Sequence, residues 1–449
     1  MKFTKMSLVA ALLIGSSAFA LENVKVSGDA NLYYQTSDAT SGYAADKNSL
    51  KNTKDSGSLF DKDSSAADVA VNLNVSADLV KNDLVSISAG AGYTVLTTLG
   101  LENNLVSNVW AGSHTATTGT GASYANLGTY NGAKVNTASW MKEAWIAATA
   151  GKTTVKLGRM ALDTPLAFTE TWTAEQNTFE GAVVINQDIP NTTLVGGYIG
   201  NGNGTETFGQ NAHSNVQTLG LAVAPVVNAN GEFTTYGKNG AYAAGVINNS
   251  WKPLTAQAWY YDVTQLATAY WLQGDLDASS LGVKGLTFGA QYSGVTKAGS
   301  GTKEDNVYAV KLGYGMKDMF AASVAYSQVN KNGTLGAAGF NTATATSGAQ
   351  SKLYTEAWWN YGHVTLRDTT AYNVTVTSPV NGMFDLGVYY TYADAKSTTN
   401  HLEEFTVTAG KSYGPLDLTL AYINAQLGKV NHVKPDATNT VQVYATLNF

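Results

Sequence analysis

Residues 441–449 read VQVYATLNF, and this C-terminal stretch decides how the rest of the chain is interpreted. Side chains alternate between the two faces of a β-strand. One face would carry Val441, Val443, Ala445, Leu447 and Phe449, and the other would carry Thr440, Gln442, Tyr444, Thr446 and Asn448. An apolar face, a polar face and a terminal aromatic residue are typical of the closing strand of a membrane β-barrel. The alternative is a half-buried strand of a soluble sheet.

The N-terminus predicts export from the cytoplasm. Lys2 and Lys5 precede an apolar run over residues 6–14, and the sequence Ala-Phe-Ala follows at residues 18–20. A basic region, a short apolar region and an A-x-A site predict a secretory signal peptide over residues 1–20. The run is too short for a transmembrane helix, which needs about 20 apolar residues. Loss of the two lysines would take the formal net charge from −6 to −8.

The composition of the mature chain, residues 21–449, favours a single all-β transmembrane barrel domain. Charged residues make up 13% of the sequence, roughly half the usual share for soluble domains. The chain has 25 Tyr, 45 Gly, 7 Pro and no Cys. Without disulfides, barrel closure would have to stabilise the exported domain by pairing every strand edge. A secreted β-solenoid or a fibrous adhesin has a similar composition, but the sequence shows no fixed repeat period.

Alternating segments of about ten residues recur along the chain, which is the length that a tilted transmembrane strand needs. The predicted strands are residues 23–36, 66–80, 84–96, 138–150, 153–160, 178–187, 192–200, 241–248, 254–262, 266–275, 284–294, 305–315, 319–329, 369–377, 384–394, 402–412, 415–424 and 439–449. Short turns alternate with long polar links such as residues 98–137 and 330–367. This asymmetry is typical of outer-membrane barrels, which have short periplasmic turns and long extracellular loops.

The direction of the strands fixes an even count, because both termini are expected on the periplasmic side. Eighteen strands satisfy this condition, and sixteen is the alternative count. Residues 216–227 also alternate like a strand. Counting them separately would put two downward strands in succession, so we assign them to a long external loop.

Five short motifs carry a resemblance to a known family. Residues 157–159 (LGR), 162–165 (LDTP) and 177–181 (NTFEG) resemble the third-loop region of the Opr/OprD-type outer-membrane porins. Residues 259–263 (WYYDV) and 270–273 (YWLQ) are also similar to that family, especially its Campylobacter-type major outer membrane porins. The recurrence of alternating strands and links resembles the family over most of the mature chain, but only these motifs are specific.

The resemblance implies a fold, a location and a function. It implies an eighteen-stranded barrel, often a homotrimer, in the outer membrane of a Gram-negative bacterium, with a third loop that folds inward. The expected function is a water-filled channel for passive diffusion of small hydrophilic solutes and ions. The expected partners are these solutes, outer-membrane lipid and lipopolysaccharide, and the assembly machinery that reads Phe449; no nucleic acid is expected. A substrate-selective channel, or a surface adhesin or antigen acting through the long loops, is the alternative.

Residues 161–177 (ALDTPLAFTETWTAEQN) form the expected inward loop, which exceeds a hairpin turn and lacks strand alternation. It contains three acidic residues and neither Lys nor Arg. The predicted pore constriction consists of Asp163, Glu170, Glu175 and Glu180, with Lys156, Arg159 and Arg367 as counter-charges on the wall. Because carboxylates at a narrow point favour cations, we expect a modest cation preference. Three acids on one loop also raise the alternative of a Ca²⁺ site, although no D-x-D-x-D spacing supports it.

Arg159 poses a problem for the predicted alternation, because it is in phase with Leu157, which should face lipid. A lipid-facing arginine costs about 2–4 kcal/mol near the membrane midplane. Either Gly158 forms a bulge that turns Arg159 inward, which we favour, or Arg159 lies at a rim. The chain has only two arginines, which argues against the arginine ladder that guides carboxylates in the substrate-specific members of the family.

The sequence gives little support to an enzyme. The five histidines all fall in predicted external loops or at their edges, and no G-x-S-x-G motif occurs. We therefore expect no catalytic residues and no cofactor. Wall charges such as Glu404 are expected to be solvated, and Trp358, Trp359 and Tyr361 are expected to pack over the barrel mouth.

Overall fold

A computed structural model describes residues 22–38, 58–60, 65–97, 99–100, 108–109, 138–171, 173–204, 227, 231–342, 349–396, 401–428 and 436–449. The predicted signal peptide lies outside the described residues. So do residues 216–226, nearly all of the segment that we assigned to a long external loop. In the ranges that the structure describes, no helix is both long enough and apolar enough to span a membrane.

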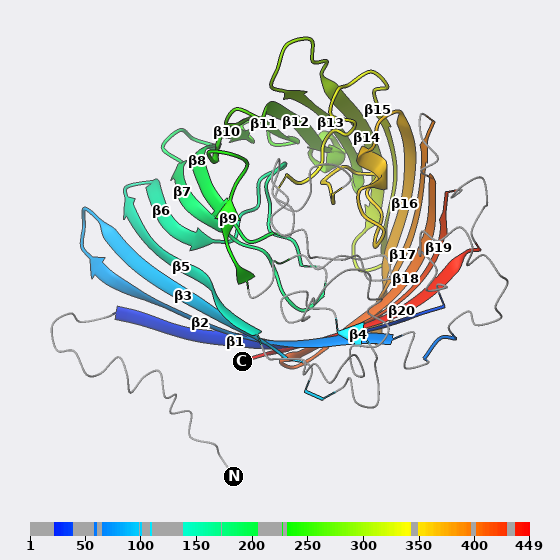
Figure 1. Cartoon of the computed structure of the whole chain (residues 1–449), viewed down its shortest axis with the longest axis horizontal. Helices are drawn as coiled ribbons and strands as arrows, with labels where there is room; N and C mark the ends of the chain where they lie inside the picture. The colour runs from blue at the N-terminus through cyan, green and yellow to red at the C-terminus, as the bar shows by residue number, and fades with distance from the viewer. Residues whose placement is uncertain are drawn as a thin grey trace.

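Eighteen long antiparallel strands in the described part of the chain form a closed barrel (Figure 1). They are β1 (Glu22–Ser37), β2 (Ser65–Lys81), β3 (Ser86–Thr97), β5 (Ala138–Ala150), β6 (Thr153–Met160), β7 (Phe179–Asn186), β8 (Thr192–Gly202), β10 (Ala241–Asn248), β11 (Leu254–Val263), β12 (Ala267–Asp277), β13 (Leu286–Lys297), β14 (Asp305–Met316), β15 (Phe320–Val329), β16 (Thr369–Val380), β17 (Phe384–Ala395), β18 (His401–Tyr413), β19 (Leu416–Leu427) and β20 (Thr438–Asn448). The smaller elements are β4 (Asn108–Val109), β9 (Thr234–Thr235) and the 3-10 helices η5 (Ala278–Leu281) and η6 (His363–Thr365). The predicted count of eighteen is confirmed.

The C-terminal strand closes the barrel. β20 pairs with β19 on one side and with β1 on the other, from Asp29 opposite Asn448 to Ser37 opposite Thr440. Gly28 and Phe449 end this ladder by exchanging two backbone hydrogen bonds, with N···O distances of 2.8 and 2.9 Å. The interpretation of VQVYATLNF as a closing strand is therefore confirmed.

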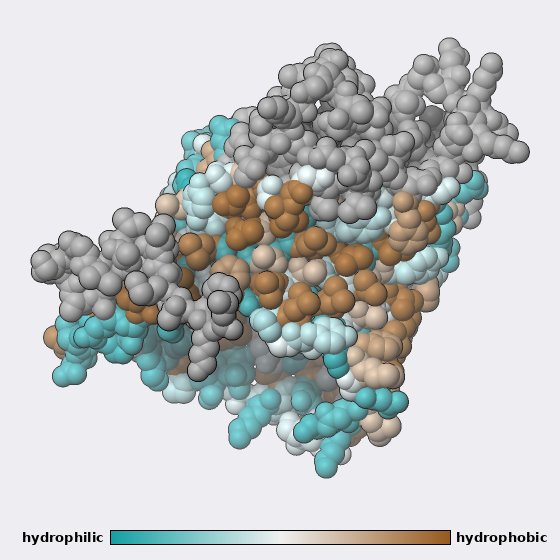
Figure 2. Space-filling model, turned by 90° about the horizontal axis from the view of Figure 1, so that it is seen from below, coloured by the Kyte–Doolittle hydropathy of each residue, from teal (hydrophilic) through white to brown (hydrophobic). Residues whose placement is uncertain are grey.

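The period of two along each strand separates an apolar outer face from a more polar interior. Figure 2 shows an apolar band across the outer face with hydrophilic residues along its lower edge. Exposed apolar side chains of this face are Leu157, Leu194, Val246, Leu272, Val310, Leu312, Val324, Val374 and Leu420. Toward the loop ends of β14–β17 lies a row of tyrosines, Tyr308, Tyr326, Tyr372 and Tyr392, with neighbouring ring centroids 5.2–6.4 Å apart. Such a row is typical of an interfacial aromatic girdle.

Short turns join the strands at one end of the barrel. The turn between β18 and β19 needs only two residues, and Gly414 adopts a φ of 62° there, which favours glycine. At the opposite end, two long connections fold into the interior (Figure 1). We call residues 161–178, between β6 and β7, L3, and residues 330–368, between β15 and β16, L7. These two loops form the candidate functional site.

Candidate functional site

L3 consists of two short hairpins in succession. In the proximal hairpin, residues 162–169, Asp163 bridges to Phe168 and the Thr169 N–H donates to the Leu162 carbonyl at 2.8 Å. In the distal hairpin, whose described residues are 170–171 and 173–177, Thr171 bridges to Gln176. L3 is therefore internally ordered by its own backbone hydrogen bonds.

The proximal hairpin packs on the inner wall at β11 and β12. Leu166 and Ala167, at its tip, are buried in one cluster with Trp259, Tyr261 and Trp271. The Leu166 N–H also donates to the Tyr261 hydroxyl at 3.4 Å. The tip is thus held mainly by apolar burial against strands that lie about 100 residues further along the chain.

The distal hairpin packs on a different part of the wall. Ala174 is buried with Ala70 of β2, Leu96 of β3 and Trp140 of β5. Because the two hairpins contact separate groups of strands, L3 extends across the interior rather than into the medium. Its predicted inward fold agrees with this arrangement.

The described residues of L7, 330–342 and 349–368, also lie inside the barrel, and two wall carboxylates bind their backbone. Asp305 of β14 accepts hydrogen bonds from the N–H groups of Leu335 and Gly336 at 2.7 and 2.9 Å. Glu404 of β18 accepts from the N–H groups of Trp359 and Asn360 at 3.0 and 2.8 Å. Glu404 is only 1% exposed, so the expectation that it is a solvated wall residue is wrong.

The middle of L7 contacts the wall at β12–β14. The Tyr354 hydroxyl donates to Asp275 at 2.6 Å, and Gln291 donates to the Lys352 carbonyl at 2.8 Å. The Lys311 ammonium lies over the Tyr354 ring, 4.1 Å from its centroid. Further along L7, Trp359 is buried and stacks on Tyr33 of β1. Trp359 therefore packs against the inner wall and not over the mouth.

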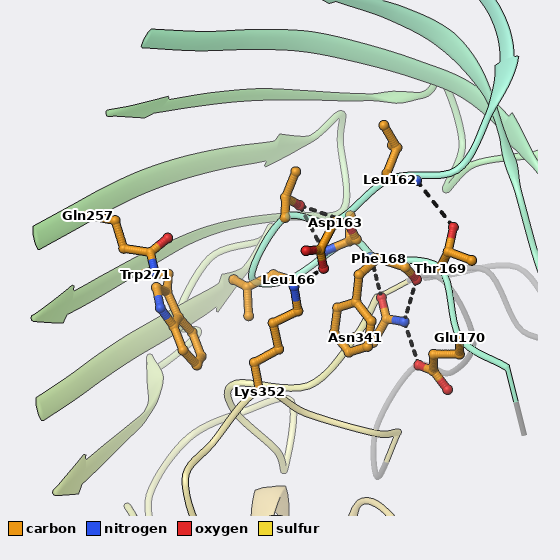
Figure 3. A network of polar contacts seen from close by, with 12 residues as sticks. Leu162, Asp163, Leu166, Phe168, Thr169, Glu170, Gln257, Trp271, Asn341 and Lys352 are labelled. Carbon is orange, nitrogen blue, oxygen red and sulfur yellow. Dashed lines mark hydrogen bonds and ion pairs between the residues drawn. The ribbon is translucent and has the colours of Figure 1, made fainter. Parts of the chain in front are cut away.

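L3 and L7 are joined to one another through the side chain of Asn341 (Figure 3). Its amide donates to the Phe168 carbonyl at 2.8 Å and to the Glu170 carboxylate, and its carbonyl oxygen accepts from the Phe168 N–H at 3.1 Å. The Thr342 N–H donates to the Leu166 carbonyl at 2.9 Å. The two loops therefore form one connected assembly inside the barrel.

The structure separates the three acids predicted for the inward loop. The Asp163 side chain is 90% exposed and forms an ion pair with Lys352 of L7 (Figure 3). Glu170 is buried and bonded to Asn341, and Glu175 is only 3% exposed. Burial, followed by the nearby charge of Asp68, raises the pKa of Glu175 to about 8. At neutral pH Glu175 is therefore mostly uncharged, and Asp163 is the L3 acid that faces open space.

The three L3 acids do not converge on a common point. Among the residues that the structure describes, no group of three or more His, Cys, Asp or Glu side chains is arranged to hold a metal ion. The Ca²⁺ site considered from the sequence stays a prediction without a matching ligand set in that part of the chain.

The other predicted constriction residues lie at different points of the wall. Arg159 donates to Glu180 at 2.7 Å and to the Met141 carbonyl at 2.8 Å. The Lys156 ammonium lies 4.3 Å from the ring centroid of Trp145. The Arg367 N–H donates to the Gly336 carbonyl at 2.9 Å, which places this residue at the base of L7.

The bulge predicted at Gly158 does not form. Gly158 has a φ of 120°, but its pairing with β5 and β7 continues in register on both sides. Extra residues occur instead in β5, opposite Gly92 and Tyr93, and in β8, beside Glu180. Arg159 therefore keeps the phase of Leu157, and as the penultimate residue of β6 it lies at the rim. The partner that makes this position tolerable is Glu180, directly opposite in β7.

Comparison with known proteins identifies the fold. No protein-family model and no curated protein matches the sequence of this chain. Among solved structures, OpdK of Pseudomonas aeruginosa, determined with vanillate, has a TM-score of 0.68 at 13% identity, covering 96% of this chain and 100% of OpdK. OccK9 (OpdG) of P. aeruginosa has a TM-score of 0.67 at 11% identity, covering 95% and 99%. OccAB3 of Acinetobacter baumannii has a TM-score of 0.65 at 12% identity, with the same coverage. At these identities the likeness shows a shared fold.

Proposed function

We propose that this chain is an OprD-type porin in the outer membrane of a Gram-negative bacterium. It would let small hydrophilic solutes and ions diffuse passively through the barrel. The single observation that supports this most is the presence of L3 and L7 inside a closed eighteen-stranded barrel with an apolar outer band. Barrels of this size enclose an aqueous channel, and inward loops reduce its cross-section. Assembly as a homotrimer, contact with lipopolysaccharide and recognition of Phe449 by assembly machinery belong to the same proposal.

The first prediction tests the channel itself. The purified full-length protein, added to a planar lipid bilayer, is expected to give stepwise ohmic current increments, because water fills the space that L3 and L7 leave open. Heat-denatured protein is the matched control. Native, heat-modifiable barrels that insert into the bilayer and carry no current would contradict the proposed function.

We further propose that the channel prefers cations modestly and that Asp163 carries this preference. Asp163 is the exposed acid of L3, whereas Glu170 and Glu175 are buried. Lys352 pairs with Asp163 and reduces the field that an ion meets. In water, a unit charge at about 4 Å contributes about 1 kcal/mol. Screening at physiological salt keeps the effect smaller than that in a wide pore.

The second prediction follows from this unequal exposure. At pH 6, where Glu175 is protonated, Asp163→Asn is expected to lower the cation-to-anion permeability ratio by roughly twofold. Glu175→Gln is expected to give a smaller change, because the substitution replaces one neutral group by another. The measurement is the reversal potential in a salt gradient, with Asp188→Asn on a short turn as the control. An equal shift for Asp163→Asn and Asp188→Asn would contradict the role of Asp163.

A substrate-selective channel is the second candidate, and one observation favours it. Lys352 lies over Phe168, 4.9 Å from its ring centroid, and Lys311 lies over Tyr354. The pairing of a cation with an aromatic ring would suit an aromatic carboxylate, and OpdK was determined with vanillate. Addition of vanillate to the bilayer chamber discriminates the two candidates: concentration-dependent current block supports selectivity, and unchanged current supports a general channel.

A further inference from the structure

The distal hairpin of L3 presents a buried carboxyl group to the barrel wall. Glu175 is 3% exposed, and its Oε2 accepts a hydrogen bond from the Thr173 hydroxyl at 3.2 Å. Its Oε1 has no hydrogen-bond partner among the described residues. A buried carboxylate with an unsatisfied oxygen is costly, whereas the neutral acid carries no charge to desolvate.

The wall at this point adds a second carboxyl group. Asp68 of β2 is fully buried, and it is the charged group whose field acts most on Glu175. Two carboxyl groups that share one site resist simultaneous ionisation. On β5, the ammonium group of Lys142 interacts with the charges of Asp29 and Glu143.

Tyr33 of β1 and Tyr361 of L7 pack in the same cluster as Ala174. The described groups that interact electrostatically with these two tyrosines are Asp68, Tyr444 of β20, Glu404 of β18, Glu170 of L3 and Glu356 of L7. None of these groups brings a positive charge toward Glu175. The Thr173 hydroxyl and the backbone N–H groups of Ala174 and Glu175 favour the ionised carboxylate, but burial and the charge of Asp68 outweigh them. The packing of the distal hairpin therefore favours a protonated Glu175.

Proton binding and docking are consequently linked. The ordinary pKa of a glutamate is 4.5, and in the docked hairpin burial raises the pKa of Glu175 to about 8. The docked state thus binds the proton more tightly than an undocked state would. The neutral carboxyl group fully supports docking below pH 4.5, the ordinary pKa of glutamate. This support is lost as the pH rises through about 8, the pKa of Glu175 in the docked hairpin. Between the two values, the ratio of docked to undocked hairpin falls by up to about tenfold per pH unit.

We propose that Glu175 is a proton-controlled latch: its neutral carboxyl group keeps the distal hairpin of L3 on the β2–β5 wall, and ionisation releases the hairpin and changes the open cross-section of the channel. The conductance change rests on the proposed function, whereas the release of the hairpin does not. The movement would be confined to the part of the distal hairpin that follows Glu170, because the Glu170 carboxylate is itself bonded to Asn341 of L7. The proximal hairpin remains tied to Asn341 and Thr342 of L7 and to Tyr261 of β11.

The first experiment is single-channel recording of the full-length protein between pH 6 and pH 8.5. In the wild type, the ratio of time in a second conductance state to time in the first is expected to rise at least about tenfold over this range. In Glu175→Gln, which keeps the shape without the charge, the ratio is expected to stay at its acid value. Glu403→Gln, which replaces an exposed glutamate of β18, is expected to respond like the wild type.

The second experiment detects the hairpin without using conductance. Because the chain has no cysteine, Ala174→Cys places a single thiol at the buried tip, and Ser250→Cys places one on an exposed turn as the reference. Each protein in detergent is treated with a water-soluble thiol reagent. The ratio of the Ala174→Cys rate to the Ser250→Cys rate is expected to rise with pH, and this rise should vanish when Glu175→Gln is added.

These experiments separate the failure of the latch from the failure of the proposed function. A thiol ratio that does not change with pH in the two cysteine variants that keep Glu175 would overturn the latch even if Glu175→Gln failed to fold. A pH response that persists in Glu175→Gln would also overturn it and would point to Glu356 of L7, whose pKa burial raises to about 7. Absence of current in every variant, together with a pH-dependent thiol ratio, would contradict the porin and leave the latch supported.

Discussion

Replacing residues 339–364 of L7 by a two-residue Asn-Gly turn is expected to raise single-channel conductance at least about twofold. The deleted segment contributes Tyr354 and Trp359, which pack on opposite parts of the inner wall. The two ends of L7 are already hydrogen-bonded to each other. The Ala338 N–H donates to the Thr365 carbonyl and the Arg367 backbone N–H donates to the Gly336 carbonyl, both at 2.9 Å. The shortened loop therefore has a hairpin geometry available without disturbing β15 or β16.

A single substitution distinguishes the effect of how L7 is held from the effect of the volume that L7 occupies. Glu404→Ala removes the acceptor for the backbone of Trp359 and Asn360 and leaves every L7 residue in place. We expect unstable conductance levels in Glu404→Ala, because the loop is still inside but less constrained. Both variants should retain the heat-modifiable mobility of a closed barrel. A shortened loop with wild-type conductance would show that L7 does not limit the current.

The strands were predictable because their pattern is local. In each one, apolar and polar residues alternate over about ten positions, and lipid on one side with a polar interior on the other preserves this alternation. Residues 384–394, for example, were predicted as a strand, and β17 spans Phe384–Ala395. VQVYATLNF fitted either a closing strand or a strand of a soluble sheet, and the recurring alternation, the composition and the family resemblance together favoured the barrel.

The electrostatics of L3 were not predictable, because they depend on contacts distant in sequence. Glu170 is buried in contact with Asn341 of L7. Glu175 is buried against the part of the wall that includes Asp68. No local pattern distinguishes these two glutamates from Asp163, which remains exposed. The position of Arg159 was not predictable for the same reason. Its partner, Glu180, lies opposite in β7, and the strand register through Gly158 is unbroken.

The inward fold of L7 was missed, although its composition contained a signal. Residues 349–364 of the loop include Leu353, Tyr354, Trp358, Trp359 and Tyr361, which is a high apolar content for a solvated loop. Apolar side chains at this density require a surface to pack on. The two anchoring carboxylates, Asp305 and Glu404, lie on strands and were indistinguishable from other wall charges without the loop in place.

Deletion of Phe449 is expected to lower the amount of assembled barrel in the outer membrane by at least about tenfold. Phe449 and Gly28 exchange two backbone hydrogen bonds where β20 pairs with β1 to close the barrel, and each such bond contributes about 1 kcal/mol. Together they are worth about 2 kcal/mol, which corresponds to more than a tenfold change in an equilibrium constant. Gly28 also leaves room for the aromatic ring, because a Cβ at that position would collide with Phe449.

Matched variants separate the backbone contribution from that of the ring. Phe449→Tyr keeps both hydrogen bonds and an aromatic ring and is expected to assemble normally, whereas Phe449→Ala keeps only the hydrogen bonds and should be intermediate. Gly28→Val is expected to resemble the deletion, since it displaces the ring and strains the same pair. The measurement is the heat-modifiable fraction in isolated outer membranes. Normal assembly of the truncated chain would mean that the remaining β1–β20 ladder, from Asp29 to Ser37, closes the barrel unaided.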